Sequence, residues 1–338
     1  MDLGVEFGLF NNRLFGEVVY FEKKTSDIIL LIPIPAQTGF SSWNSNIADV
    51  TNKGWEITIG GDLIRSKDFR WNSTFNISFV DNNVDALNGG ATTDFGSAGI
   101  IEGQPIGVIV GYDVVTIALT QAEIDALNAA APDGNYFSGL TQPGDYIYRD
   151  IDGDGEITNA DRGPLGDINP DYFGGWNNTL TYKNFDFALN FNFVQGNKKE
   201  WARGANEFAF VDPNKNVTTA VFNTWTPDNT DATYARIGSA THGTFPATSK
   251  NVEDGSYIKL RSASLGYNLP KKWLNKSGID NLRISLSGNN LFVITNYPGI
   301  DPESVDIQNG GSTVALTRDG GFAYPQARTF TLGFNLSL

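Results

Sequence analysis

The residues best suited to chemistry lie in one acidic loop, residues 150–161. Carboxylates occupy loop positions 1, 3, 5 and 12, and Gly155 stands at position 6. A hard cation such as Ca²⁺ takes about six to eight oxygen ligands, and this spacing gathers them around one sharp turn, with the carbonyl of residue 7 adding another. The spacing therefore predicts a calcium site. Its expected ligand residues are Asp150, Asp152, Asp154, Glu156 and Asp161.

The loop departs from an EF-hand in two ways. Position 12 is Asp161 rather than Glu, so its bidentate reach is shorter and the expected affinity is modest. The flanking residues predict strand and turn instead of helices. A solvated acidic turn is the alternative, but four carboxylates this close repel one another without a cation.

Other candidate residues carry weaker signals. The chain has no cysteine, which excludes disulfides and thiolate zinc sites, and its one histidine, His242, lies in a Gly/Thr/Ser-rich segment typical of a solvated loop. Trp201, Trp225 and Tyr234 could stack on sugar rings, although loop packing or an aromatic belt at a membrane surface is the favoured interpretation.

The remaining acidic and capping motifs indicate structure. Asp152 and Asp154 are too close in sequence to flank a sugar as a glycosidase pair, which needs about 5 Å or more between carboxyls, and no enzyme is expected. Asp301 and Glu303 could form a second acidic site, but a turn is favoured. Thr120-Gln-Ala-Glu before Ile124 predicts a capping box that opens a short helix.

Composition narrows the function classes. The 338 residues include 24 Lys+Arg against 38 Asp+Glu, a formal net charge of −14, so no nucleic-acid partner is expected. No apolar run reaches the roughly 18 residues of a membrane helix, and the first residues do not resemble a signal peptide.

Alternation is the strongest structural signal. In the last ten residues Phe330, Leu332, Phe334 and Leu336 fall on one face, and Thr, Gly, Asn and Ser fall on the other. A Phe/Leu/Trp face opposite a small polar face is typical of an outer-membrane barrel, with lipid outside and water inside. Near 261–263 the apolar residues switch from even-numbered to odd-numbered positions, which predicts a β-bulge. Strands are expected at 2–10, 13–23, 52–64, 69–80, 174–182, 185–196, 257–269, 281–292 and 328–338.

The connections alternate between short and long, as the periplasmic turns and extracellular loops of such barrels do. The long connections are expected at 24–51, 81–173, 197–256 and 293–327. The fold class predicted is therefore all-β: the C-terminal part of a large antiparallel transmembrane barrel of about nine or ten strands. The alternative is a secreted calcium-binding β-sandwich or adhesion module, which would also show alternating strands.

The odd number of strands predicts an incomplete barrel, because bacterial single-chain barrels use even numbers. The simplest explanation is that a strand running from the periplasmic to the extracellular side precedes residue 2. Strands 2–10 and 328–338 are then expected to have unpaired edges, and the chain alone is not expected to form a pore.

Several motifs resemble the SusC/RagA family of TonB-dependent outer-membrane transporters from Bacteroidetes. They cover essentially the whole chain and occur in the family's order. The segments that carry the resemblance are Asn11–Leu14, Asn169–Asn178, Trp225–Asn229 with Arg236, Tyr257–Arg261, Leu265–Pro270, Gly288–Phe292 and Tyr297–Glu303.

The resemblance implies a part of a nutrient importer in the cell outer membrane, with contact to outer-membrane lipid. Its expected partners are a SusD-like surface lipoprotein and the TonB complex, the latter acting through a plug domain that this sequence does not contain. Oligosaccharide or peptide is the expected substrate, and the sequence does not indicate which residues bind it. Residues 1–338 are expected to form one partial barrel, with the loops 81–173, 197–256 and 293–327 outside the cell and the acidic loop 150–161 within the first of them.

Overall fold

The computed structural model describes residues 1–34, 36–40, 42–87, 93–94, 98–137, 140, 142–201, 219–239, 248–275, 278–303 and 325–338. His242, singled out above, lies outside these residues. In the described part, no helix combines the length and apolarity needed to cross a membrane.

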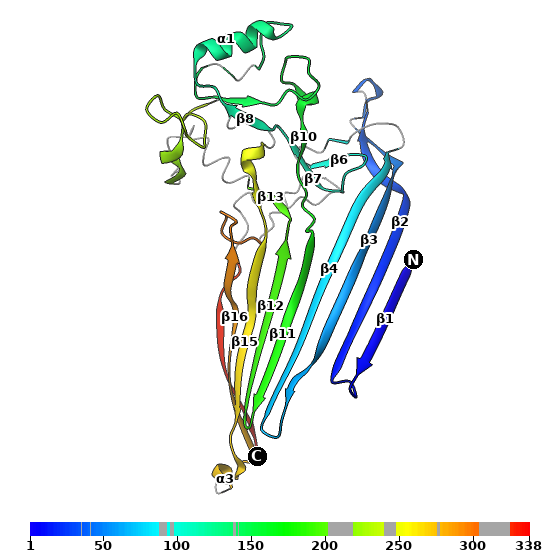
Figure 1. The fold of residues 1–338 in the computed structure, drawn as a ribbon, viewed down its shortest axis with the longest axis vertical. Coiled ribbons are helices and arrows are strands. Elements are labelled where there is room, and N and C mark those ends of the chain that lie inside the picture. The colour runs from blue at the N-terminus through cyan, green and yellow to red at the C-terminus, as the bar shows by residue number, and fades with distance from the viewer. Residues whose placement is uncertain are drawn as a thin grey trace.

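Nine long strands form one antiparallel sheet, and each strand pairs with its neighbours along the chain (Figure 1). The sandwich alternative is wrong, because these strands build a single sheet and not two packed ones. The strands in sheet order are β1 (Asp2–Leu9), β2 (Leu14–Pro33), β3 (Ser42–Arg65), β4 (Phe69–Leu87), β11 (Tyr172–Tyr182), β12 (Phe185–Gln195), β15 (Tyr257–Asn268), β16 (Asn281–Thr295) and β17 (Thr329–Ser337).

All nine strands predicted from alternation are present, and the bulge is confirmed. The register shifts between Leu260 and Ser262 where β15 pairs with β16. The pairing of β12 with β15 shifts between Asn190 and Phe191. The extra residue on β15 accounts for the parity change in the sequence.

The prediction of a long loop at 24–51 is wrong. β2 continues to Pro33 and pairs with β3 from Ser42, so only a short connection remains. Positive φ at Asp27 and two register shifts near Ile28 interrupt the alternation there, which hid the strand. β4 also runs past residue 80 to Leu87, beyond its predicted end.

Turns at one end of the sheet are short, and the other end carries most of the remaining residues (Figure 1). The β1–β2 turn places Phe10, Asn11 and Asn12 at φ of 55–59°, and the β11–β12 turn places Lys183 at 53°. A short helix, α3 (Lys271–Leu274), lies in the β15–β16 turn. Following the rule for bacterial barrels, the turn end is the periplasmic end.

The opposite end of the sheet carries a folded cap. Its helix α1 (Gln121–Ala130) lies at the far end of the molecule from α3 (Figure 1). Its small strands are β5 (Thr93–Asp94), β6 (Ala98–Ile100), β7 (Val108–Gly111), β8 (Val114–Ile117), β9 (Tyr146–Tyr148), β10 (Gly163–Gly166), β13 (Lys198–Glu200) and β14 (Val252–Asp254). Its 3₁₀ turns are η1 (Ala36–Thr38), η2 (Asn159–Asp161), η3 (Thr219–Asn223) and η4 (Ser249–Asn251).

Two hydrophobic cores lie outside the membrane-type sheet face. The larger core gathers around α1, β8 and β9 and includes Ile124 and Tyr148, each 1% exposed. The smaller core lies between the upper parts of β2, β3 and β4 and the segment around Ile100. These two cores pack the described loop segments together and against the upper end of the sheet.

The two outermost strands each have one neighbour among the described strands. β1 pairs with β2, and β17 pairs with β16. The strands described here therefore do not close into a barrel, as the odd strand count predicts.

Candidate functional site

One face of the sheet is apolar across its whole width. Phe334 pairs with Ile284, and Leu332 pairs with Leu286, which pairs in turn with Leu265. No described part of the chain covers these side chains, since Phe330 is 69% exposed and Phe334 65%. Side chains of this size and exposure are typical of a lipid-facing surface.

Aromatic side chains form two rows on this face, one toward each end of the strands. The row nearer the cap contains Tyr20 and Trp55, whose ring centroids are 5.1 Å apart. The row nearer the turns contains Phe185 and Tyr267, at 4.4 Å. Further members are Phe79, Tyr172 and Phe193 in the first row, which we call the outer girdle, and Phe69 and Tyr182 in the second, the inner girdle.

The spacing of the girdles matches a bilayer. Tyr172 and Tyr182 mark the two rows on β11 and are ten residues apart. At about 3.3 Å per residue and a tilt of about 40°, ten residues rise about 25 Å, which is the height of the apolar band of outer-membrane barrels.

Charges begin again directly beyond the outer girdle. Lys53 and Asp81 are paired at 3.0 Å, two residues beyond Trp55 and Phe79 on the same face. Lys24 and Glu22 pair at 3.5 Å on β2. The return of charge marks the outer edge of the lipid-facing band.

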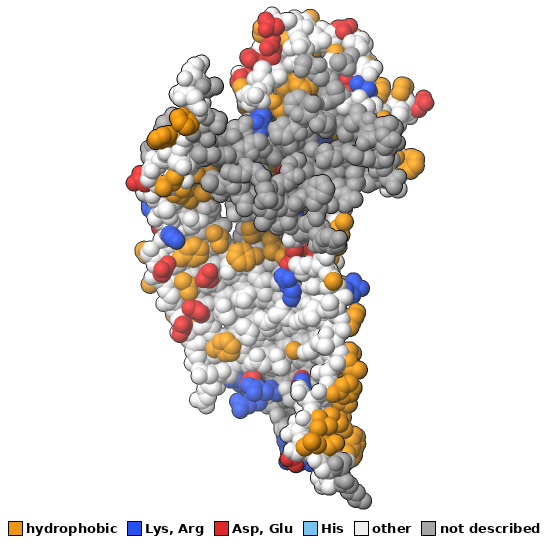
Figure 2. All heavy atoms as spheres, turned by 180° about the vertical axis from the view of Figure 1, so that it is seen from behind, with side chains coloured by type: hydrophobic (Ala, Val, Ile, Leu, Met, Phe, Trp, Pro, Cys, Tyr) orange, Lys and Arg blue, Asp and Glu red, His pale blue; other side chains and the backbone are white. Residues whose placement is uncertain are grey.

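Polar side chains fill the opposite face. Figure 2 shows its middle as mostly uncharged, non-hydrophobic side chains and backbone, with hydrophobic groups along one edge and across the upper part of the sheet. Its ion pairs cross between strands. Near the periplasmic end, the Arg70 Nε atom lies 2.9 Å from the Asp62 carboxylate, and Arg283 forms an ion pair with Asp186. A wet lumen accommodates these groups, whereas hydrocarbon would not.

A buried ion-pair network fixes one loop to the lumen face, and the sequence did not predict it. Glu303 contacts Lys259 and accepts a hydrogen bond from Arg261 at 2.6 Å. Lys259 and Arg261 on a strand of otherwise small or apolar residues were the available signal. Asp301 and Glu303 thus anchor the loop to the strand, and the Lys259 Nζ atom lies 3.9 Å from Asp301.

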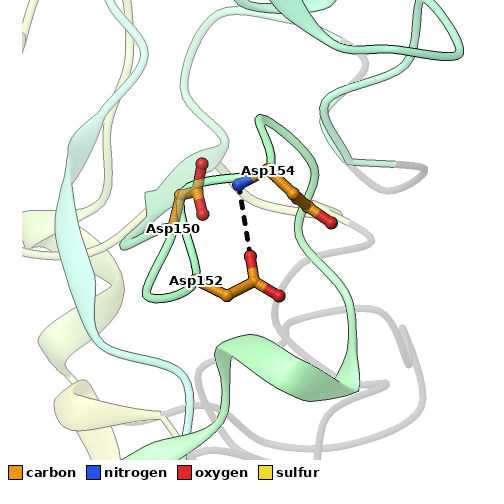
Figure 3. Close-up of side chains that lie close together, drawn as sticks. All are labelled: Asp150, Asp152 and Asp154. Carbon is orange, nitrogen blue, oxygen red and sulfur yellow. Dashed lines mark hydrogen bonds between the residues drawn. The ribbon is translucent and has the colours of Figure 1, made fainter.

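The acidic loop brings three of its predicted residues together. The carboxylates of Asp150, Asp152 and Asp154 offer oxygen atoms within 4.8 Å of one another (Figure 3). Asp150 also accepts hydrogen bonds from the backbone N–H groups of Gly153 and Gly155, at 2.6 and 2.8 Å. Both glycines have positive φ, 77° and 87°, which lets the chain fold around the Asp150 carboxylate.

The other two predicted residues lie outside this group of three. Asp161 is fully buried, and its carboxylate accepts the backbone N–H groups of Ile151 at 2.8 Å and Thr158 at 2.7 Å. The Glu156 side chain accepts a hydrogen bond from the backbone N–H of Asp133 at 3.0 Å. Asp161 therefore closes the loop and caps η2, and Glu156 ties the loop to the end of α1.

Electrostatics favour a cation among the three carboxylates. The hydrogen bond from the Asp154 backbone lowers the pKa of Asp152, but partial desolvation and the neighbouring carboxylates of Asp154, Asp161 and Asp150 outweigh it. The net result is a raised pKa of Asp152, as expected when like charges meet. Carboxylate oxygens are the ligands that hard divalent cations prefer, so this triad could bind a metal.

The larger core of the cap joins residues from distant segments of the chain. Asp145 is fully buried and pairs with Arg236 at 2.9 Å. Trp225 packs against the same core, which supports the packing interpretation for this residue over sugar stacking.

The predicted helix is present as α1, and the Thr120 side chain accepts a hydrogen bond from the backbone N–H of Glu123 at 3.2 Å.

Comparison with known proteins agrees with this geometry. No protein-family model matches the chain. TonB-dependent receptor P3 of Formosa agariphila is 35% identical over 99% of the chain, which corresponds to 33% of the receptor. TonB-dependent receptor SusC of Bacteroides thetaiotaomicron is 26% identical over 98% of the chain and 31% of its own length.

Solved structures show the same fold. The RagAB peptide transporter aligns with a TM-score of 0.76 at 21% identity, over 99% of this chain and 34% of the other. The RagAB peptide importer in its open-open state aligns with a TM-score of 0.73.

Sheet, girdles and relatives together define a class, the TonB-dependent transport proteins of the outer membrane. The chain is a SusC/RagA-like TonB-dependent receptor sequence, and its sheet corresponds to part of the barrel. It spans about a third of the length of the curated relatives that it matches.

Proposed function

We propose that the chain forms part of the wall and the outer cap of a TonB-dependent importer of oligosaccharide or peptide. A SusD-like lipoprotein would rest on the cap, and the TonB complex would act through a plug outside this sequence. The transporter of similar fold is a peptide transporter, which supports the peptide alternative, and the SusD-like partner is proposed from the similarity to SusC.

One observation carries this proposal. The same sheet presents an apolar face between two aromatic girdles and a polar face with cross-strand ion pairs, and a folded cap stands at one end. A wall that separates lipid from a wet lumen needs both faces. Loops positioned by a rigid scaffold are where binding residues usually lie, so the cap is the proposed partner surface. Import requires binding and gating and no catalytic group.

The domain assignment follows the same proposal. Residues 1–338 form one partial barrel, with outer loops within 81–173, 197–256 and 293–327. The first loop begins after Leu87 in the described residues, and the second contributes Trp225 and Arg236 to the core of the cap.

The test uses the full receptor that contains this chain. A tagged receptor is extracted from outer membranes in detergent, with and without a deletion of residues 108–166. We expect the intact receptor to co-purify with a SusD-like lipoprotein and to support uptake of a labelled peptide or oligosaccharide. The deletion should leave the barrel assembled and abolish both. A receptor that retains lipoprotein and uptake without the cap would contradict the proposal.

For the acidic loop we propose a structural Ca²⁺ site with ligands from Asp150, Asp152 and Asp154, completed by the backbone carbonyl of Glu156 and by Asp161. The crowded carboxylates and the raised pKa of Asp152 support it. Calcium would hold the loop against α1 and stabilise the cap. Isothermal titration of the full receptor should show one site that Asp152→Asn abolishes. An equal heat in the variant would leave a solvated acidic turn.

A further inference from the structure

A pocket opens on the lipid-facing side of the sheet at the level of the outer girdle. Its volume is ≈ 580 Å³, within the range of about 300–1,000 Å³ typical of small-molecule sites. Tyr20, Trp55 and Phe79 form its aromatic floor. These three side chains share the lipid-facing register of β2, β3 and β4, so the pocket lies on the outer wall and not in the lumen.

Polar groups line the rim on the side away from the membrane. Lys53 and Asp81 form their ion pair there. The segment before β11 adds Asp167, Asn169 and Asp171. Asn169 donates to Asp167 from its backbone N–H at 2.8 Å and from its side chain at 2.9 Å, so this part of the rim is held in place.

The carboxylates of the rim are close enough to influence one another. Burial raises the pKa of Asp167, the Asn169 hydrogen bonds oppose this, and the charges of Asp171 and Asp81 raise the pKa further. Three carboxylates therefore converge with one ammonium group, Lys53, which Asp81 already holds. An anionic occupant such as a phosphate would be repelled, whereas hydroxyl groups donate well to carboxylates.

We propose that this pocket binds a neutral sugar ring in the headgroup of an outer-leaflet glycolipid. A sugar ring has an apolar face, which Trp55 can cover because 48% of this residue is exposed, and hydroxyl edges, which the carboxylates and Asn169 can bind. The pocket lies where the apolar band ends and charges begin, which is the depth of a lipid headgroup. A soluble substrate in the lumen would be on the other side of the sheet.

Native mass spectrometry of the full receptor tests the proposal. The receptor is placed in nanodiscs of phosphatidylethanolamine, with or without an added neutral diglycosyl diacylglycerol as the glycolipid. We expect the receptor to retain one glycolipid that phosphatidylethanolamine does not replace. Trp55→Leu should lower the retained fraction by about tenfold, since loss of an aromatic contact costs on the order of 1 kcal/mol or more.

Two further variants distinguish loss of the pocket from general damage to the barrel. Asp171→Asn is an exposed rim substitution that should also reduce retention without disturbing the barrel. Tyr182→Leu removes a comparably exposed aromatic residue of the inner girdle and should change nothing. Equal loss in all three variants, or equal retention in all, would overturn the proposal. Binding of the free headgroup oligosaccharide as tight as that of the intact glycolipid would also overturn it, in favour of a soluble glycan. Because the readout is lipid retention, its failure is distinct from failure of import.

Discussion

The sheet and the cap obey opposite rules of burial. In the sheet, the large apolar side chains point outward and stay exposed, as Phe330 and Leu332 do at 69% and 60%. In the cap, side chains such as Ile124 and Tyr148 are enclosed in a conventional core. The sheet therefore depends on lipid as its missing apolar partner, whereas the cap contains its own.

The comparison also concerns charge. The cap buries Asp145 completely and pairs it with Arg236, while the sheet keeps its ion pairs on the lumen face or beyond the outer girdle. Substitutions should therefore fail for different reasons in the two regions. Each prediction below uses the full receptor and tests one side of this difference.

The largest effect is expected for Arg236→Met in the cap. It removes the Arg236 guanidinium from the buried Asp145 carboxylate, and breaking a buried ion pair typically costs about 3–5 kcal/mol. Hydrogen–deuterium exchange should accelerate across residues 112–157, with the sheet unchanged. Arg149→Met is the matched control, because Arg149 pairs with Asp113 at the surface with 60% of its side chain exposed, and such pairs contribute about 0–1 kcal/mol. Unchanged exchange in Arg236→Met would show that the pair does not hold the cap together.

The next effect is expected for Phe191→Arg in the sheet. Phe191 lies on the lipid-facing side between the girdles, and a charge near the bilayer midplane costs about 2–4 kcal/mol. The fraction of receptor that migrates as folded, heat-modifiable barrel should fall. Asn190→Arg places the same charge one residue away on the lumen face and should assemble normally. Equal assembly of the two variants would contradict the assignment of the faces.

These faces could be predicted from alternation, because side chains of a strand alternate strictly and a lipid-facing wall makes the pattern visible. The helix at Thr120 could be predicted as well, since its cap is local. The interruption at Asp27 and Ile28 hid the upper part of β2, because a left-handed residue and a bulge remove the period. The Lys259–Glu303 network joins residues 44 positions apart, and no local pattern encodes such a contact.

The acidic loop shows the same limit at the scale of one site. Spacing placed Asp150, Asp152 and Asp154 together, since Asx-type hydrogen bonds to nearby N–H groups fold such a loop locally. Spacing did not indicate that Asp161 is fully buried and caps η2. That burial depends on the core around Tyr136 and Ile157, which comes from tertiary packing.

A moderate effect is expected when calcium is removed. If the loop binds Ca²⁺, a hundredfold excess over Kd stabilises the cap by about 2.7 kcal/mol, and chelation removes this. Exchange at residues 150–161 should accelerate after EDTA in the wild type but not in Asp152→Asn. No response to EDTA in the wild type would contradict the site.

The raised pKa of Asp152 gives this site a pH dependence. Calcium needs the charged form of Asp152, so protons compete with calcium at a higher pH than they would at an ordinary carboxyl. Affinity should therefore fall as the pH drops from neutrality toward the carboxyl range of about 4. Titrations at two pH values in the same buffer measure the shift. Constant affinity would mean that Asp152 is not a ligand.

The smallest effect concerns a polar pair set into the apolar face. Asn178 and Ser73 face each other across β11 and β4 on the lipid-facing side, and the indoles of two tryptophans cover them. The Trp71 indole N–H donates to the side-chain Oδ1 atom of Asn178 at 3.0 Å, and the Trp176 indole N–H donates to the Ser73 hydroxyl at 2.9 Å. Asn178 is only 5% exposed, so lipid does not reach the polar atoms.

The pair explains why Ser73 breaks the apolar alternation of its strand without breaking the wall. Trp71→Phe should cost about 1–3 kcal/mol, because it leaves the Asn178 oxygen buried without a donor. The double variant Trp71→Phe with Asn178→Leu removes both polar partners and should recover most of that loss, as a double-mutant cycle on heat-modifiable migration would measure. If the double variant assembles no better than Trp71→Phe alone, the hydrogen bond is not what holds the polar pair in the lipid-facing surface. Packing of the indole over Asn178 would then be the stabilising contact.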